Sequence, residues 1–346
     1  MFNIAFVIRA SAAKQKGGDF FQAQETAKEL RALGVNVDLF FSGDSINYKK
    51  YNALHFFNII RPSDILRHTK KSNIPYFIST VFVEYPTRLK FLSFFIEYCK
   101  TILRPMLKKD LMPCRQYILL GQKKSMKIAL DNAKALFPNS YSEQKRLEKK
   151  MNQEFKNVFV INNGINTNVF KMNKKQNTKE KFILSVGRIE PIKNQLNLIR
   201  AAKNLDKKLI IVGNPSSNKK YYKKCLREAN DNVTFIPFID QSEIAKYYNQ
   251  ATLHVLPSYF ETTGLVSLEA AACGCNIIVT EKGDQREYYK EIALFCNPDN
   301  ISSIEDQISI LWNKKRNYFN QSILVAEKFS WKQSAFETLK VYKSLL

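Results

Sequence analysis

The sequence has no apolar run of the roughly 18 residues that a membrane-spanning helix needs. Its six cysteines form no Cys-x-x-Cys pair, and Cys273 and Cys275, which flank a glycine, are too few ligands for zinc and poorly placed to bridge each other. We therefore expect free buried thiols in a reducing cytoplasm. The opening residues, MFNIAFVIRA, precede no small-residue cleavage site and are typical of a first strand rather than a signal peptide.

Two ligand-binding motifs are also missing. The loop containing Gly17 and Gly18 lacks the G-x-G-x-x-G spacing of an ordinary dinucleotide site. No Asp-x-Asp motif stands at the end of an expected strand, so we expect neither a bound metal nor a cofactor. A paired glycine before a helix is equally common in ordinary turns.

Acidic residues are scarce beside basic ones, with 31 Asp and Glu against 54 Lys and Arg and a formal net charge of +23. Such a field would attract nucleic acid, anionic lipid or a phosphorylated substrate. A generally lysine-rich composition is the alternative explanation. No aromatic and basic platform or helix-turn-helix pattern accompanies the charge, so nucleic acid is not an expected partner.

The length of 346 residues predicts two domains, and the alternation of short apolar runs with helical patterns predicts parallel α/β sheets. A helix is expected from about Phe20 to Leu33, after Gly17 and Gly18. A lysine-rich polar stretch at 171–181 has the composition of a linker. The expected strands are 3–8, 35–41, 53–57 and 75–80 in the first half, and 182–186, 208–213, 233–236, 252–256 and 276–280 in the second.

One stretch, Pro257 to Glu287, organises the rest of the chain. A buried strand runs into it, and Glu261 then lies in a loop before a buried-type helix that contains Glu269. Gly264 allows close backbone approach where the helix begins and exposes N–H groups. Both carboxylates are expected at the carboxyl end of a parallel sheet, the usual ligand position in open α/β folds. A capping or surface role for Glu269 is the alternative, but its flanking residues are those of a buried helix.

The segment ETTGLVSLE resembles the E-x7-E signature of retaining glycosyltransferases of the GT-B fold, in glycosyltransferase family 4 (group 1). LPSYFE, AACGCNIIVTEKGDQREY and FILSVGRIEPIKNQ extend the resemblance. It implies an α/β protein with two Rossmann-like domains facing each other across a cleft. An acceptor-side domain at 1–168 and a nucleotide-sugar domain at 169–328 would be followed by a helix at 329–346 that crosses back to the first domain.

The resemblance also implies roles for individual residues. Glu269 would hold the donor ribose hydroxyls, and Glu261 would lie beside the donor sugar. Arg188 and Lys193 would neutralise the leaving diphosphate, so that no metal is needed; a pair of surface cations is the alternative. The further expected nucleotide-sugar contacts are Gly17, Gly18, Gly187, Gly213, Thr262, Thr263, Gly264, Leu265 and Phe238.

The acceptor side departs from the family. Many relatives carry a histidine after the strand at 75–80, whereas STVFVEYP here has none. His55, Asn58, Glu84 and Tyr85 are the acceptor-side candidates, and ordinary packing is the alternative for His55.

Residues 88–127 contain ten basic residues against Glu97 and Asp110. Apolar residues from Phe91 to Leu103 recur at three- and four-residue intervals, which predicts an amphipathic basic helix on an anionic membrane. A helix packed on the first sheet is the alternative.

The expected function is metal-independent, retaining transfer from a UDP-sugar or GDP-sugar to a glycan or lipid-linked oligosaccharide acceptor, in surface polysaccharide synthesis. We expect it in the cytoplasm at the inner face of the plasma membrane. A GT-B sugar-nucleotide epimerase or phosphorylase is the alternative, followed by a nucleic-acid-binding protein.

Overall fold

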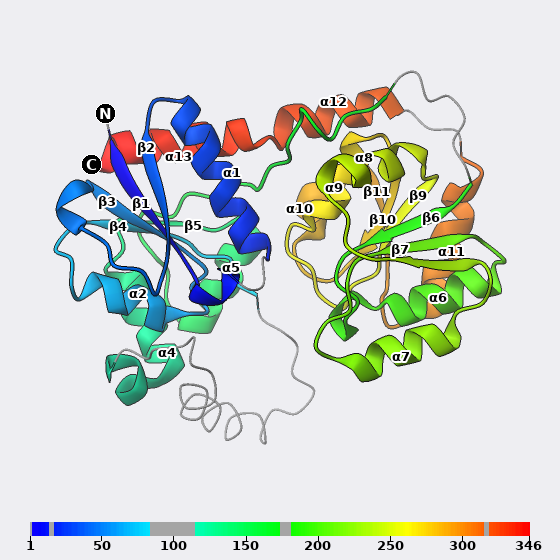
Figure 1. Cartoon of the computed structure of the whole chain (residues 1–346), viewed down its shortest axis with the longest axis horizontal. Coiled ribbons are helices and arrows are strands. Elements are labelled where there is room, and N and C mark those ends of the chain that lie inside the picture. The colour runs from blue at the N-terminus through cyan, green and yellow to red at the C-terminus, as the bar shows by residue number, and fades with distance from the viewer. Residues whose placement is uncertain (1, 14–16, 84–114, 174–180, 315–317) are drawn as a thin grey trace. The chain divides into compact units, whose positions relative to one another are not determined.

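The chain forms two compact units, each a parallel sheet with helices on both faces (Figure 1). Unit 1 consists of Met1–Asn163 and Trp331–Leu346, and unit 2 of Gly164–Ser330. No helix among the described residues combines the length and apolar character needed to cross a membrane. The computed structural model describes residues 2–13, 17–83, 115–173, 181–314 and 318–346.

Unit 1 contains a five-stranded parallel sheet in the order β2-β1-β3-β4-β5. The helices α1 and α13 cover one face, where Tyr342 packs among buried side chains of the strands. The helices α2, α4 and α5 cover the other face. The elements are β1 (Asn3–Ile8), η1 (Ala10–Ala13), α1 (Gly18–Ala32), β2 (Asn36–Phe41), η2 (Tyr48–Lys50), β3 (Ala53–Phe57), α2 (Pro62–Thr69), β4 (Tyr76–Ser79), α4 (Arg115–Asp131), β5 (Ala135–Phe137), α5 (Tyr141–Met151) and α13 (Trp331–Leu345).

Unit 2 contains a six-stranded parallel sheet in the order β11-β10-β9-β6-β7-β8. Side chains of α8, α9, α10 and α12 bury one face, and those of α6, α7 and α11 bury the other. The elements are β6 (Ile183–Val186), η3 (Pro191–Lys193), α6 (Gln195–Asn204), β7 (Leu209–Val212), α7 (Lys219–Glu228), β8 (Val233–Ile236), α8 (Gln241–Gln250), β9 (Leu253–Leu256), α9 (Leu265–Ala272), β10 (Asn276–Thr280), α10 (Gln285–Tyr289), β11 (Ala293–Cys296), α11 (Ile301–Trp312) and α12 (Tyr318–Lys328).

Each sheet has one point where the strand order reverses. In unit 2 the chain leaves β6 toward β7 on one side and returns to β9 on the other, so β6 and β9 are adjacent parallel strands whose following loops diverge. In unit 1 the equivalent pair is β1 and β3. Ligands of open α/β sheets bind at the carboxyl ends of such strands. A ligand-binding site is therefore expected at these two switch points.

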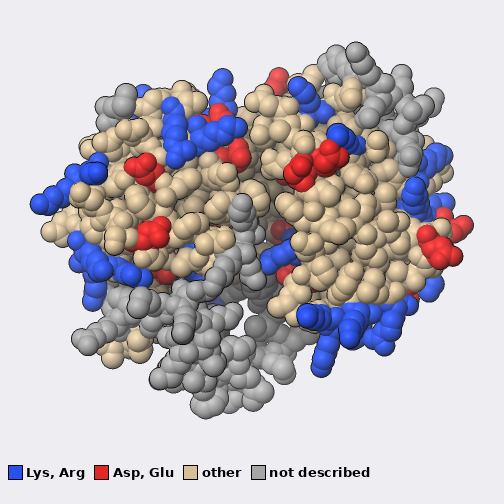
Figure 2. Space-filling model, viewed as in Figure 1, with Lys and Arg blue, Asp and Glu red and all other residues tan. Residues whose placement is uncertain are grey.

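Exposed basic side chains occur in both units. Figure 2 shows Lys and Arg side chains gathered along α7 of unit 2, where Lys219, Lys220, Lys223 and Lys224 are exposed. This helix lies on the outer layer of its sheet, far in sequence from the basic stretch at 88–127. Most of that stretch, residues 88–114, lies outside the described residues. Its end forms part of α4, where Ile118 and Leu119 are exposed apolar side chains.

Candidate active site

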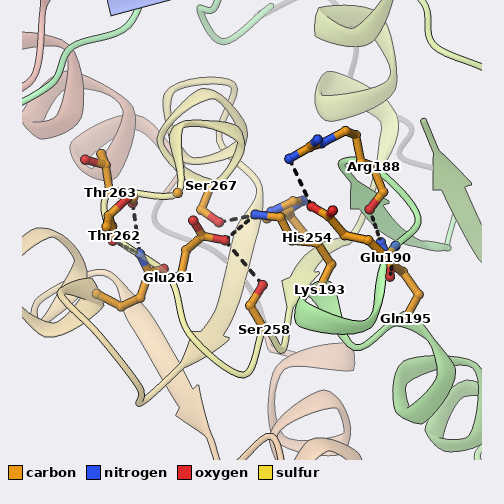
Figure 3. Close-up of polar contacts among 12 residues, drawn as sticks. Arg188, Glu190, Lys193, Gln195, His254, Ser258, Glu261, Thr262, Thr263 and Ser267 are labelled. Carbon is orange, nitrogen blue, oxygen red and sulfur yellow. Dashed lines mark hydrogen bonds and ion pairs between the residues drawn. The ribbon is translucent and has the colours of Figure 1, made fainter. Parts of the chain in front are cut away.

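The switch point of unit 2 carries a lysine and a glutamate in direct contact. Lys193, from the loop after β6, places Nζ 2.5 Å from Oε2 of Glu261, which follows β9. Ser258 Oγ donates to the same carboxylate oxygen over 3.3 Å (Figure 3). The two charged side chains are 22% and 11% exposed, so water screens this pair less than an open surface pair. One oxygen of Glu261 is thus held by the protein, and the other makes no hydrogen bond among the described residues.

Asn194 fixes the backbone that presents Lys193. This residue adopts left-handed geometry with φ of 57°, which turns the chain from η3 into α6. Its side-chain Nδ2 donates to the carbonyl of Pro257 at 3.1 Å and to that of Pro298 at 2.8 Å. The backbone N–H of Tyr259 also donates to the carbonyl of Ile192 at 2.8 Å. The loops after β6 and β9 are therefore joined before any ligand enters.

Arg188 is near the same edge but pairs differently. Its guanidinium lies 3.2 Å from Glu190 Oε1, and its side chain is 60% exposed (Figure 3). Gln195 Nε2 holds the Arg188 carbonyl at 2.8 Å, so the backbone is fixed while the guanidinium faces solvent. A mobile exposed cation on a fixed backbone can turn toward an incoming anion at the expense of a weak surface pair.

Two glycines bring the ends of β6 and β7 into contact. Gly213 has φ of 144°, and a Cβ built there would lie 2.2 Å from the carbonyl oxygen of Gly187. Gly187 itself has φ of 145°, and its N–H donates to the Val212 carbonyl at 2.9 Å. Only glycine permits this close approach. These two predicted contact residues therefore lie side by side, and Gly187 directly precedes Arg188 in the chain.

The loop bearing Glu261 is clamped by a second loop from β10 to α10. Asp284 N–H donates to the Glu261 carbonyl at 3.0 Å, and a Cβ at Gly283 would lie 1.9 Å from that oxygen. Gln285 Nε2 donates to the Thr262 carbonyl at 2.5 Å and to that of Thr263 at 2.9 Å. The clamp orients the backbone at the start of α9.

The turn into α9 is fixed in the same way. Gly264 has φ of 64° and caps the helix that Leu265 begins. Tyr289 from α10 donates its hydroxyl to the carbonyls of Thr263 and Gly264, each at 2.8 Å. With these carbonyls turned toward Tyr289, the first turn of α9 presents N–H groups, a favourable position for sugar or phosphate oxygens.

Glu269 lies inside α9, about one turn further along. Burial raises the pKa of its carboxyl to about 8, although a hydrogen bond from Tyr248 acts in the opposite direction. Tyr248 Oη donates to Glu269 Oε2 at 3.2 Å. A carboxyl held this way is costly to leave ionised in the empty protein, which is common at functional sites. Phe238, a predicted contact that follows β8, is 67% exposed.

Gly17 and Gly18 belong to unit 1, where Gly17 is the residue before α1 and Gly18 is its first residue. A Cβ at Gly17 would lie 2.8 Å from Arg9 Nη2, so the glycine leaves room for the Arg9–Asp19 ion pair at 2.5 Å. Asn58 Nδ2 donates to Asp19 at 3.3 Å. Gly17, Gly18 and Asn58, three of the predicted ligand contacts, thus lie in the segments that follow β1 and β3 at the switch point of unit 1.

His55 corrects a prediction for the acceptor side. Its ring is 1% exposed in the core of unit 1, with Nδ1 2.5 Å from Tyr342 Oη and Nε2 3.0 Å from Ser79 Oγ. Burial lowers its pKa to about 3, so the ring stays neutral. His55 is a packed core residue because its strand is buried on both faces. Glu84 and Tyr85 lie outside the described residues.

The sequence did not reveal the residues that hold this arrangement in place. Asn194 could have been suspected, since an asparagine directly before a helix readily adopts left-handed geometry. No local sequence pattern marks Gln285, Tyr248 or Tyr289, because each donates a hydrogen bond to a residue more than 20 positions away in the chain. Among the described residues, no group of three or more His, Cys, Asp or Glu side chains is arranged to hold a metal ion.

Comparison with protein families matches residues 167–323 to glycosyl transferases group 1. An uncharacterized glycosyltransferase of Methanocaldococcus jannaschii is 32% identical over 209 residues, which are 54% of this chain and 54% of the relative. A D-inositol 3-phosphate glycosyltransferase of Mycobacteroides abscessus is 28% identical over 236 residues, 62% of this chain and 52% of the relative. The matched segments thus span about half the length of these relatives.

Solved structures of low sequence identity share the fold over the whole chain. Sucrose-phosphate synthase from Thermosynechococcus elongatus has a TM-score of 0.77 at 18% identity, covering 100% of this chain and 99% of that one. An Anabaena protein solved in complex with UDP and glucose has a TM-score of 0.74 at 14% identity, covering 100% of both chains. The expected fold class, two parallel-sheet α/β domains of the GT-B type, is confirmed.

Proposed function

We propose that the chain transfers a sugar from a nucleoside-diphosphate sugar with retention of anomeric configuration, because residues 167–323 match the model of group 1 glycosyl transferases. The observation that carries the proposal is the Lys193–Glu261 pair at the switch point of unit 2. It places a cation suited to a diphosphate beside a carboxylate suited to a cationic sugar. An Anabaena structural neighbour solved with UDP and glucose supports a uridine nucleotide, with guanosine as the other candidate.

Lys193 and Arg188 supply the stabilisation that the leaving group needs. Departure of the nucleoside diphosphate places negative charge on its terminal oxygens, and a fixed cation at that point lowers the barrier. The backbone that carries Lys193 is fixed by the Asn194 hydrogen bonds. Arg188 breaks its ion pair with Glu190 and binds a phosphate oxygen instead. With these two cations and the N–H groups of α9, the transfer needs no metal ion.

Glu261 and Glu269 divide the remaining work. The unengaged oxygen of Glu261 faces the position of the sugar, where it orients a hydroxyl and offsets positive charge at the anomeric carbon. Glu269 receives the ribose hydroxyls as hydrogen-bond donors. Front-face transfer and passage through a covalent intermediate would both keep the anomeric configuration.

The donor proposal is tested by thermal shift with UDP, GDP, UDP-glucose and GDP-mannose, with and without EDTA. A ligand at 100 times its Kd stabilises the folded state by roughly 2.7 kcal/mol, which is readily visible as a raised Tm. We expect one nucleotide class to raise the Tm of the protein. We also expect the rate of sugar transfer to be the same with and without EDTA. If no nucleotide raises Tm, the proposal is wrong. If chelation abolishes turnover and magnesium or manganese restores it, the metal-independent part is wrong.

The enzymatic alternatives are separated by their products. An epimerase would change the sugar nucleotide without an acceptor, and a phosphorylase would require inorganic phosphate as the acceptor. An oligonucleotide that binds in a salt-dependent way, with no nucleotide-sugar binding, would indicate a nucleic-acid-binding protein instead. The exposed lysines of α7 are the surface that would bind nucleic acid in that case.

For the acceptor we propose a lipid-carried oligosaccharide or glycan at the inner face of the plasma membrane. The support is the basic and aromatic sequence at 88–127 and, within it, the exposed Ile118 and Leu119 before the kink of α4 at Gly121 and the exposed Lys123 and Lys124 after it. Apolar side chains next to cations suit insertion into an anionic interface. A soluble cyclitol phosphate is the competing acceptor, since several relatives are named D-inositol 3-phosphate glycosyltransferases.

Liposome co-sedimentation tests the membrane proposal. We expect binding to vesicles containing phosphatidylglycerol that weakens with salt and is absent with neutral phosphatidylcholine. The variant Lys100→Glu/Lys108→Glu/Lys109→Glu should lose binding. A matched variant, Lys219→Glu/Lys220→Glu/Lys223→Glu on α7, makes the same charge change in unit 2 and should retain it. Equal recovery in the supernatant with anionic and neutral lipid would rule out the membrane and favour a soluble acceptor.

A further inference from the structure

Tyr248 is a fully buried residue near the end of α8 whose hydroxyl reaches a carboxylate on a different helix. Its Oη donates to Glu269 Oε2 at 3.2 Å, and α8 and α9 pack against each other. The family match and the E-x7-E pattern assign nothing to this tyrosine. The bond occupies one oxygen of Glu269 and leaves the other to the ligand.

The tyrosine ring is fully buried and tightly packed. It makes edge-to-face contacts with two rings, with centroid distances of 6.1 Å to Phe170 and 5.8 Å to His254. Cys275 Sγ donates to the Tyr248 carbonyl at 3.0 Å, so the backbone is anchored as well. A hydroxyl on a rigid ring fixes the carboxyl plane of Glu269, which is the kind of support that a precise binding group requires.

We infer that Tyr248 is a positioning residue for donor binding, which holds the Glu269 carboxyl by one oxygen so that the other accepts the nucleotide ribose. The inference rests on the proposed function, since it takes a nucleoside-diphosphate sugar as the ligand. Tyr248 touches no reacting atom in this arrangement. Its loss should therefore change affinity for the donor rather than the rate of transfer.

The protonation of Glu269 gives this role a measurable signature. Burial raises the pKa of this carboxyl to about 8, and the Tyr248 bond lowers it from a still higher value. The ribose hydroxyls are best accepted by the ionised form, so donor affinity should rise with pH up to about 8 and then level off. Replacing Tyr248 removes a bond to the ionised form, which raises the pKa of Glu269 and moves this midpoint upward.

Three neighbouring titratable side chains, His254, Tyr248 and Tyr289, do not change charge in this pH range. The pKa of His254, from β9, is lowered by burial to about 3, and the ring is neutral throughout. Burial raises the pKa of the Tyr248 and Tyr289 hydroxyls well above their usual range. On α12, which also packs against α9, Glu327 and Lys328 are exposed to solvent.

The test is calorimetric titration of Tyr248→Phe with UDP-glucose, and with GDP-mannose if the uridine compound does not bind, from pH 6 to 8.5. A sugar nucleotide is used because its diphosphate has no proton to lose in this range. At pH 7 we expect a roughly 3- to 10-fold weaker Kd. The midpoint of the pH dependence should shift upward, KM for the donor should rise, and kcat at saturating donor should stay within about twofold.

Tyr342→Phe is the matched control, because Tyr342 is equally buried and its hydroxyl also bonds one side chain, His55 in unit 1. It should lower Tm without moving the pH midpoint. Loss of affinity in Tyr248→Phe that is equal at every pH, or no loss, overturns the inference. If Tyr248→Phe does not fold, Glu269→Gln decides, since its binding must become independent of pH. A wild type that binds neither sugar nucleotide refutes the proposed function itself.

Discussion

Glu261→Gln should reduce turnover on the order of 100-fold while changing donor affinity by no more than a few-fold, because the charge it removes acts mainly in the transition state. Glutamine has the same shape, so Ser258 and Lys193 retain a neighbouring oxygen or nitrogen at the carboxylate position. The carboxylate charge that we propose to offset the forming sugar cation is lost. The measurement is kcat and KM at saturating acceptor, together with donor Kd.

A matched substitution separates this effect from the simple loss of an ion pair. Glu243→Gln removes a carboxylate that pairs with Lys246 on the exposed surface of α8, in the same unit. Exposed pairs contribute at most about 1 kcal/mol, so this variant should keep both turnover and Tm near wild type. Wild-type turnover in Glu261→Gln would remove Glu261 from the mechanism. Loss of donor binding without loss of turnover of bound donor would exchange its role with that of Glu269.

Gly283→Ala should be the most damaging small substitution in the clamp around Glu261. Its φ of 97° is strained for alanine, and the added methyl would lie 1.9 Å from the Glu261 carbonyl oxygen. Backbone must move to relieve such an overlap, at a cost of about 3 kcal/mol or more. The hydrogen bond from Asp284 to that carbonyl would be lost, and Glu261 would be displaced. We expect a clear fall in Tm and near-complete loss of activity.

Gly34→Ala provides the control for backbone strain alone. Gly34 has φ of 84°, similarly unfavourable for alanine, but a Cβ there meets no atom within 4 Å. The expected cost is only about 1–2 kcal/mol, with activity retained below the melting transition. Thermal unfolding and activity at 25 °C check both variants. Equal effects at the two positions would mean that the contact between Gly283 and Glu261 has no special importance.

The sequence predicted unit 2 well because its strands are short apolar runs bounded by glycine or proline. The expected strands at 233–236 and 276–280 coincide with β8 and β10. Ser140 caps α5 through its hydroxyl, which accepts from the Glu143 N–H at 2.9 Å. The helix after Gly17 begins at Gly18 rather than Phe20, because Gly17 adopts the extended cap geometry. The edge strand β11 was missed, since ALFC is too short to carry a periodic signal.

The candidate site was only half predictable for a different physical reason. Glu261, Lys193 and Glu269 stand in contiguous patterns, so local sequence indicates them. Which oxygen is engaged and which is available depends on contacts between distant segments, such as Asn194 with Pro298 and Tyr248 with Glu269. The misjudged His55 is of the same kind, since its partner Tyr342 lies 287 residues away.

Unit 1 is built from two separate pieces of the chain, and this has a consequence for synthesis on the ribosome. The last helix, α13, contributes Ala335, Leu339 and Tyr342 to the core against α1 and the first sheet. Unit 1 therefore cannot complete its core until the ribosome has made residues 331–346, whereas unit 2 is continuous from Gly164 to Ser330. Domains usually finish folding from the N-terminus onward. Here unit 2 can complete its core first, whereas the sheet of unit 1 keeps an apolar face uncovered until α13 has been made.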